Sequence, residues 1–242
     1  MRAVVLRVDA PLVSFGDVLV DHHGVIDRFP LASQLTGLFG NALGWTHRDF
    51  DSLQTLQDNL VYAARWDVEP HLLIDYHTVD LTQSGLNYPG WTTHGVPEHR
   101  GGGPAARQRQ RYQHYWADGL MTIVVSFLGD PALNLSIEAV EQALRYPARP
   151  LFWGRKTCLP ARPILDLQSI QEGRDVLDVL SHVPRWDRRG FPNDSPEPME
   201  ATWPAELSAP GSYDTRQIFG LREWANQIPA GSYWHHRGMI QL

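Results

Sequence analysis

The segment that decides the predicted fold is Arg28-Phe29-Pro30-Leu31-Ala32-Ser33-Gln34-Leu35-Thr36-Gly37-Leu38-Phe39-Gly40-Asn41-Ala42-Leu43-Gly44. Its apolar side chains recur at helical spacing, and Pro30 suits the first turn of a helix. Gly44 is a typical helix end, because glycine adopts the left-handed conformation without strain. The pattern therefore predicts a helix over residues 30–44.

Strand patterns lie on both sides of this helix. Residues 2–9 alternate around Val4, Leu6 and Val8, which predicts the first strand. Further strands are predicted at 61–68, 72–79, 121–128, 151–158, 213–219 and 233–240. Further helices are predicted around Leu56 and at 136–146 and 170–180, and loops at 10–27, 80–113 and 184–210.

The order strand, helix, strand, strand, helix, strand is the split βαβ pattern. It predicts an α+β chain with a ferredoxin-like palm, the architecture of the RNA-recognition motif. A loop as long as 80–113 inside a compact domain is usually a functional arm. We therefore expect a palm built from 1–79 plus 114–242, with a C-terminal extension, and an extended thumb insertion at 80–113.

Composition narrows the class of protein. The chain has 242 residues, is 43% hydrophobic and contains 18 prolines and 20 glycines, which is consistent with one large domain rich in loops. Cys158 is the single cysteine, so an internal disulfide is excluded. No apolar stretch reaches the length of a membrane span, and the first residues have a strand pattern instead of a signal peptide. We expect a cytoplasmic protein with no membrane partner.

Positive charge is concentrated although the formal net charge is −6. Two windows, 99–117 and 142–165, contain no acid and carry most of the clustered basic side chains. Lys156, in the second window, is the only lysine of the chain. Local basic clusters with nearby aromatic rings favour binding of single-stranded nucleic acid, whereas the acidic remainder argues against a general DNA-coating protein.

Three segments supply candidate RNA-binding residues. The start of the 30–44 helix offers free N–H groups to phosphate, helped by Arg28 and Ser33. The arm supplies arginine forks for phosphate and a tyrosine for stacking, namely Arg107, Arg109, Arg111 and Tyr115. The run Pro150-Leu151-Phe152-Trp153-Gly154-Arg155-Lys156-Thr157-Cys158-Leu159-Pro160 supplies Trp153, Arg155 and Lys156.

Each segment also has a purely structural interpretation. Gly37, Gly40 and Gly44 fall on roughly one helix face, which is typical of tight packing of the helix against a sheet as well as of ligand approach. The arm is equally typical of a solvated loop. In an extended run, Arg155 and Lys156 would point to opposite sides, with Trp153 packed in the core on the side of Arg155.

Histidine is the main indication of an enzyme. A metal-free ribonuclease needs a base, an acid and a cationic stabiliser, and His77, Tyr115 and Lys156 supply these types. The sequence has no H-x-x-x-H or C-x-x-C spacing, so no metal or other cofactor is expected. It also lacks a P-loop and a G-x-S-x-G elbow.

Several segments together resemble the CasD family of the type I-E CRISPR surveillance complex Cascade. The matching features are the opening strand, Gly16, the 28–44 helix and three motifs, Asp75-Tyr76-His77-Thr78-Val79, Tyr115-Trp116-Ala117-Asp118 and Phe152-Trp153-Gly154-Arg155-Lys156-Thr157-Cys158. The resemblance covers most of the chain. It departs at Gln113, where the family usually has an arginine and for which Arg111 is a substitute, and at Ala117-Asp118-Gly119.

The resemblance implies a non-catalytic subunit that binds the 5′ handle of CRISPR RNA (crRNA) in antiviral defence. It also implies a cap on the CasC backbone next to the large subunit CasA, with target DNA met only indirectly through the complex. A sister subtype uses its CasD homologue as the processing ribonuclease. A metal-free endoribonuclease acting on CRISPR repeat RNA is therefore the alternative function.

Overall fold

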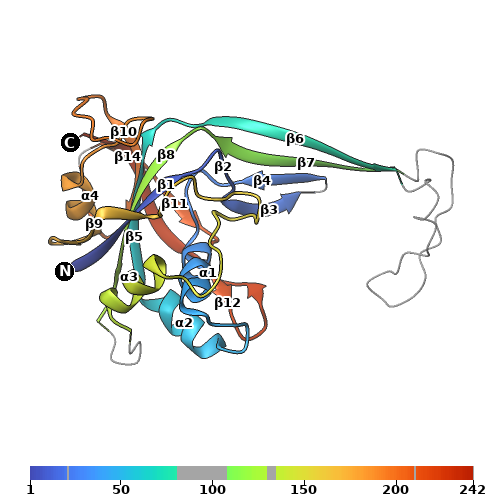
Figure 1. The fold of residues 1–242 in the computed structure, drawn as a ribbon, viewed down its shortest axis with the longest axis horizontal. Helices are drawn as coiled ribbons and strands as arrows, with labels where there is room; N and C mark the ends of the chain where they lie inside the picture. Colours follow the sequence, from blue (N-terminus) through green and yellow to red (C-terminus); the bar gives the residue numbers. More distant parts are fainter. Residues whose placement is uncertain (21, 81–107, 130–134, 210, 242) are drawn as a thin grey trace.

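The computed structural model of the 242-residue chain describes residues 1–20, 22–80, 108–129, 135–209 and 211–241 (Figure 1). The helices are α1 (Ala32–Leu43), α2 (Phe50–Asn59), α3 (Ile137–Arg145) and α4 (Val176–His182). The strands are β1 (Arg2–Asp9), β2 (Leu12–Val13), β3 (Gly16–Val20), β4 (His23–Ile26), β5 (Leu60–Val68), β6 (His71–Asp80), β7 (Gln108–Ala117), β8 (Leu120–Phe127), β9 (Leu165–Glu172), β10 (Met199–Pro204), β11 (Ser212–Ile218), β12 (Arg222–Glu223), β13 (Ile228–Pro229) and β14 (Tyr233–Ile240).

A seven-stranded sheet in the order β11-β14-β10-β5-β8-β1-β9 forms the body of the molecule. Every pairing in it is antiparallel. Both faces are covered, as the strand β1 shows. Val4, Leu6 and Val8 join the core beneath α1 and α3, whereas Ala3 and Val5 join the core beneath α4. Because successive side chains of a strand point to opposite faces of the sheet, β1 contributes to two hydrophobic cores.

A second sheet holds the strands that project from this body. It has the order β2-β7-β4-β3, and β6 pairs with the free side of β7. The β6–β7 hairpin extends far beyond the first sheet (Figure 1). The predicted helix at 30–44 and the strands at 2–9, 61–68, 72–79 and 121–128 are confirmed as α1, β1, β5, β6 and β8.

Five predictions of secondary structure are wrong in whole or in part. The predicted loop at 10–27 contains the short strands β2, β3 and β4. They form because β2 and β4 pair with β7, and β3 pairs with β4. The predicted loop at 184–210 contains β10, whose Ala201 and Trp203 are buried between β5 and β14. The predicted helix at 170–180 divides into the end of β9 and the start of α4, which Asp175 caps.

The predicted strand at 151–158 is a loop of turns. Gly154 has a φ of 91°, and a Cβ at this position would lie 1.7 Å from the carbonyl oxygen of Ser14. Only glycine allows this approach. The predicted arm at 80–113 is a strand from residue 108 onward, and the prediction for 81–107 lies outside the described residues.

Asp67, next to the last residue of β5, is the centre of a buried ionic cluster and is only 1% exposed. Its carboxylate accepts hydrogen bonds from Arg7 and Arg65, each at 2.7 Å, and from the Thr122 hydroxyl at 2.7 Å. The backbone N–H of Trp186 donates a further bond at 3.1 Å. The Asp67 side chain therefore links strands β1, β5 and β8 to the chain that follows α4.

Replacing Asp67 with asparagine should destabilise the fold by about 3–5 kcal/mol, because buried Arg65 loses its counter-charge and buried Arg7 keeps only that of Asp166. Denaturant unfolding of the full chain measures this free energy. The matched control is Asp194→Asn, an exposed acid without a partner in the described residues, which should change stability by less than about 0.5 kcal/mol. Equal stabilities of the two variants would contradict the central role of Asp67.

Candidate nucleic-acid interface

The β6–β7 hairpin presents two distinct faces. Opposed residues of an antiparallel pair lie on the same face, so the register assigns each side chain to a face. One face carries Leu72, Ile74 and Tyr76 opposite Trp116, His114 and Tyr112. The other carries Leu73, Asp75 and His77 opposite Tyr115, Gln113 and Arg111. The second face is the more polar, and exposed Arg111 lies on it.

Arg155 fixes the base of this second face. Its guanidinium donates to the carbonyl oxygen of His114 in β7 at 2.9 Å and to that of Gly24 in β4 at 3.3 Å. The same group lies 4.7 Å over the ring of Tyr115. One side chain from the 151–158 loop therefore joins two strands of the second sheet, and an arginine fork is suited to this because it carries several donors in a plane.

Gly24 makes room for this contact. A Cβ on Gly24 would lie 2.8 Å from a guanidinium nitrogen of Arg155 and 3.1 Å from the side-chain oxygen of Gln113. Gln113, the position at which the resembled family usually has arginine, thus lies beside Arg155. A second arginine at 113 would place two cations side by side, and the glutamine avoids that repulsion.

The predicted interface residues of the 150–160 run, and Tyr115 of the arm, are either engaged within the protein or exposed to solvent. Trp153 is 3% exposed and Tyr115 is buried, so both rings pack in the core and neither offers a face to a base in this structure. The side chain of Arg155 is engaged by backbone carbonyls. Lys156 is exposed and next to Arg155. The structural interpretation of the aromatic residues accounts for Trp153, whereas Lys156 is available to a polyanion.

Arg28 is buried in a network of protein groups. It pairs with Glu200 at 2.7 Å and with Glu69, and its guanidinium lies 4.7 Å over the ring of Trp116. Burial acts to raise the pKa of Glu200, but the hydrogen bonds and charges of Arg28 and Arg237 lower it below its ordinary value. The predicted phosphate contact of Arg28 therefore competes with carboxylates that already neutralise it.

The start of helix α1, the predicted phosphate site at Ser33, is also occupied by protein groups. The N–H of Ala32 donates to the hydroxyl of Tyr233 at 3.2 Å, and that of Ser33 donates to the carbonyl of Gly220 at 3.1 Å. The next two N–H groups donate to the carbonyl of Leu31. The first-turn donors that would hold a phosphate are thus already used.

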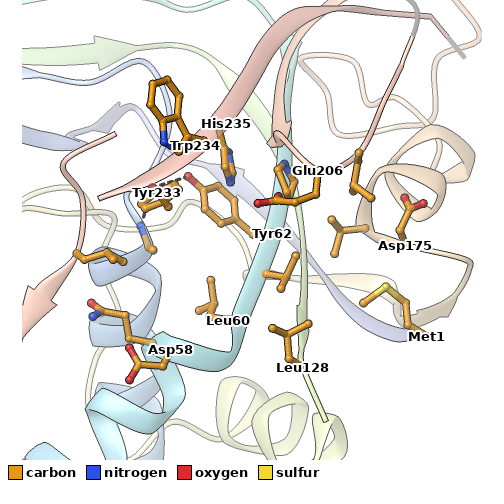
Figure 2. A pocket seen from close by; sticks show the side chains of 17 residues that line it. Met1, Asp58, Leu60, Tyr62, Leu128, Asp175, Glu206, Tyr233, Trp234 and His235 are labelled. Carbon is orange, nitrogen blue, oxygen red and sulfur yellow. Dashed lines mark hydrogen bonds between the residues drawn. The ribbon is translucent and has the colours of Figure 1, made fainter. Parts of the chain in front are cut away.

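A cluster of polar side chains, Tyr62, Tyr233 and His235, lies next to the start of α1. Tyr62 donates to the carbonyl of Pro30 at 2.7 Å, and its hydroxyl lies 3.0 Å from that of Tyr233 (Figure 2). The ring of His235 lies 4.8 Å from that of Tyr62, and its Nδ1 is 3.1 Å from the Thr202 hydroxyl. Burial and then the charge of His236 lower the pKa of His235 to about 3, so the imidazole is neutral.

The glycines of α1 are explained by packing and capping. A Cβ on Gly40 would lie 2.6 Å from a methyl carbon of Leu53 in α2. Gly44 caps the helix with a φ of 83°. Gly40 thus lies against another helix, α2, and not against the sheet, whereas Gly44 ends α1 as predicted.

The residues of the alternative ribonuclease do not converge. In the hairpin register Tyr115 pairs with Leu73 and His77 with Arg111, four residues farther along. At about 3.3 Å per residue this separation is roughly 13 Å, beyond the reach of a shared proton-transfer site. His77 instead lies 2.7 Å from the carboxylate of Asp75. Within the described residues no group of three potential ligands can hold a metal ion.

Sequence reasoning missed the other face of the hairpin. The ring of His23 stacks on that of Tyr112 at 4.6 Å with an angle of 7°, and Tyr76 lies 5.1 Å from Tyr112. Burial, followed by the charges of His23 and Arg155, lowers the pKa of His114. No local pattern signals this group, because it requires the parallel pairing of β4 with β7. Of the predicted arm arginines, Arg109 pairs with Val79, and Arg107 lies outside the described residues.

Comparison with known proteins agrees with the fold. The family model described as "CRISPR-associated protein (Cas_Cas5)" matches residues 3–232. The chain is 28% identical over 181 residues to the CRISPR system Cascade subunit CasD of Escherichia coli (strain K12), covering 75% of this chain and 77% of that protein. A chain of a CRISPR RNA-guided surveillance complex superposes with a TM-score of 0.68 at 17% identity, covering 99% of this chain and 90% of that one. A crystal structure of a Cas protein superposes with a TM-score of 0.62 at 21% identity, covering 99% and 94%.

The two solved structures, one of a CRISPR surveillance complex and one of a Cas protein, share the overall fold of this chain, which is of the mixed α+β class. Within that class, the family match spans nearly the whole chain, so this chain belongs to the CRISPR-associated protein (Cas_Cas5) family. No helix of the described residues is long and apolar enough to cross a membrane.

Arg155→Ala should loosen the base of the hairpin, because two carbonyl contacts and a ring contact are lost together. We expect hydrogen exchange at the Tyr112 amide, which donates to the carbonyl of His22, to accelerate roughly tenfold. Arg155→Lys should restore little of this protection, since an ammonium lacks the planar fork. The neighbouring variant Lys156→Ala is the control and should leave the exchange rate unchanged. Unaltered exchange in Arg155→Ala would show that the contacts do not fix the hairpin.

Stability should fall as the pH drops from about 6.5 toward 3. Because the folded-state pKa of His235 is about 3 and the unfolded value 6.5, the unfolded state binds the extra proton in this window. The loss reaches on the order of 3 kcal/mol by pH 4. Denaturant unfolding at several pH values should show a flatter profile for His235→Gln, whereas the exposed control His47→Gln should keep the steep one. Identical profiles in both variants would contradict this assignment.

Proposed function

We propose that the chain is a non-catalytic subunit of a Cascade-type surveillance complex that binds the 5′ handle of CRISPR RNA in antiviral defence. The observation that carries the proposal is the β6–β7 hairpin, whose polar face is fixed to the body by Arg155 and carries Arg111. Membership of the Cas5 family and the likeness to a Cascade subunit support it.

The body would form a ferredoxin-like palm and residues 80–113 the thumb. The strand order β5-β8-β1-β9, with α1 and α3 on one face, supports this because it is the order of a split βαβ sheet. Residues 1–79 and 114–242 make up the proposed palm and its C-terminal extension. β7 begins at residue 108, so the boundary at 113 divides this strand.

The RNA would lie along the polar face of the hairpin and across the 151–158 loop. Lys156 and Arg111 are the described cations that we assign to phosphate, since both are exposed. Arg107 and Arg109 extend the same basic window in sequence. Arg155 would act mainly as the residue that positions the hairpin. The single-stranded handle would then bind chiefly through its backbone charge.

The protein partners would be CasC backbone subunits and the large subunit CasA. The chain would cap one end of the CasC filament, with the hairpin reaching over the RNA near the junction of handle and spacer. Target DNA would meet the chain only through the assembled complex, in the cytoplasm. The likeness to a Cascade subunit supports a partner complex of this kind.

RNA binding is tested with labelled handle RNA and the purified full chain across a salt series. Lys156→Ala and Arg111→Ala should each weaken binding and lower the slope of log K against log salt by about 0.7, the value for one phosphate of a single strand. The matched control is Arg174→Ala, an arginine just before α4 whose side chain is 84% exposed. It should leave the slope unchanged.

Equal slopes in all three variants would contradict the assigned interface. The same RNA, as full repeat, is incubated with the chain in the presence of chelator and should remain intact. A defined cut that disappears in His77→Ala would instead support the metal-free endoribonuclease.

A further inference from the structure

A cavity of about 740 Å³ lies at the end of the first sheet that faces away from the hairpin (Figure 2). Its walls include Leu60 at the start of β5 and Leu128 after β8. The hairpin leaves the body at the opposite ends of the same two strands, after Val68 and before Leu120. The length of β5 separates the two regions by roughly 30 Å. The cavity is therefore distinct from the proposed RNA interface.

The floor of this cavity is apolar, and its polar atoms are already paired. Leu60, Val61 and Val176 are among its lining side chains. The hydroxyls of Tyr62 and Tyr233 bond to each other, to the carbonyl of Pro30 and to the N–H of Ala32. A small polar ligand is usually oriented by a few convergent polar groups, and this floor offers none that is free. Apolar side chains of another protein fit it better.

Large apolar side chains at the mouth remain exposed in the isolated chain. Leu128 is 55% exposed, and Met1 and Trp234 are also open to solvent. Exposed apolar side chains gathered around one cavity mark an interaction surface, whereas single scattered ones do not. Leu128 follows β8 and Trp234 lies on β14, so the surface is built by the fold and is not a single sequence run.

The rim of the cavity is acidic. Asp58 at the end of α2, Asp175 at the start of α4 and Glu206 after β10 line it, and Figure 2 shows them around Leu60 and Leu128. Neither arginine nor lysine is among the lining residues. Glu206 is exposed and has no hydrogen-bond or ion-pair partner in the described residues. Three carboxylates repel a phosphate backbone and attract basic side chains.

We propose that this groove docks a segment of a partner protein that inserts an apolar side chain between Leu60 and Leu128 and is flanked by arginine or lysine. The basic flank would pair with Glu206 and Asp58, and an arginine there can also lie over the half-exposed ring of Trp234. The chain would then hold RNA at one end of the β5–β8 pair and a protein at the other. The proposal does not depend on RNA binding by the hairpin.

Two substitutions on exposed positions test the groove without disturbing the core. The full chain, as wild type, Leu128→Asp or Glu206→Lys, is titrated into the remaining protein subunits of the surveillance complex of its own host. We expect at least tenfold weaker association for Leu128→Asp and a smaller loss for Glu206→Lys. The matched controls are Leu167→Asp, an apolar residue that is 92% exposed on β9, and Glu197→Lys in the chain before β10. Both controls should stay within about twofold of wild type.

Affinity for handle RNA is measured on the same variants, so that failure of RNA binding and failure of docking are seen separately. A benzophenone-bearing residue in place of Leu128 then identifies the occupant within the assembled complex. A cross-link to a peptide of another subunit that carries an apolar residue next to arginine or lysine supports the proposal. Unchanged association of Leu128→Asp, or cross-links to RNA, to a second copy of this chain or to an acidic peptide, would overturn it.

Discussion

The carboxylate of Asp67 is the contact on which the arrangement of the body depends. Arg7, Arg65, Thr122 and the backbone of Trp186 all donate to it in a place that water does not reach. Taking these charges out of water is costly, so the cluster stabilises the fold only while every donor has its acceptor. Burial lowers the pKa of Arg65 despite the pull of Asp67 in the other direction. The chain after α4, which leads into β10, is held to β5 by this cluster.

Much of the positive charge of this chain serves such internal contacts. Arg7, Arg28 and Arg65 are buried, and Arg155 bridges carbonyls of two strands. The case of Arg155 shows that an arginine in an acid-free stretch of sequence is not by itself a phosphate ligand. The surface proposed for RNA is narrower than the sequence indicates. The hairpin that carries it is joined to β4 by Arg155, for which Gly24 leaves room. The acidic groove at the other end of the sheet gives the molecule two surfaces of opposite character.

The sequence predicted the elements whose patterns are local. The helix at α1 and the strands β1, β5 and β8 each carry an apolar period that needs no knowledge of neighbours. It failed at β3, β4 and β10, which are short strands defined by the edges that they join. Sequence reasoning named Arg28, Ser33, Trp153 and Arg155 as RNA ligands because residue type shows which contacts a side chain can make. It does not show which protein groups that side chain already contacts. The Glu200 partner of Arg28 lies 172 residues away, and the Gly220 carbonyl at Ser33 is even more distant in sequence. Only the folded chain reveals such partners.

Lys156 is the only lysine of the chain, and its side chain is exposed. Apart from the chain's own α-amino group, which donates to the carbonyl of Gly173, it is the sole primary amine of the protein. Reagents that acylate amines would therefore place a dye or a tether on a single side chain in the loop beside Arg155. Quenching or anisotropy of that dye would report directly on whatever approaches this loop, with no need to engineer a cysteine.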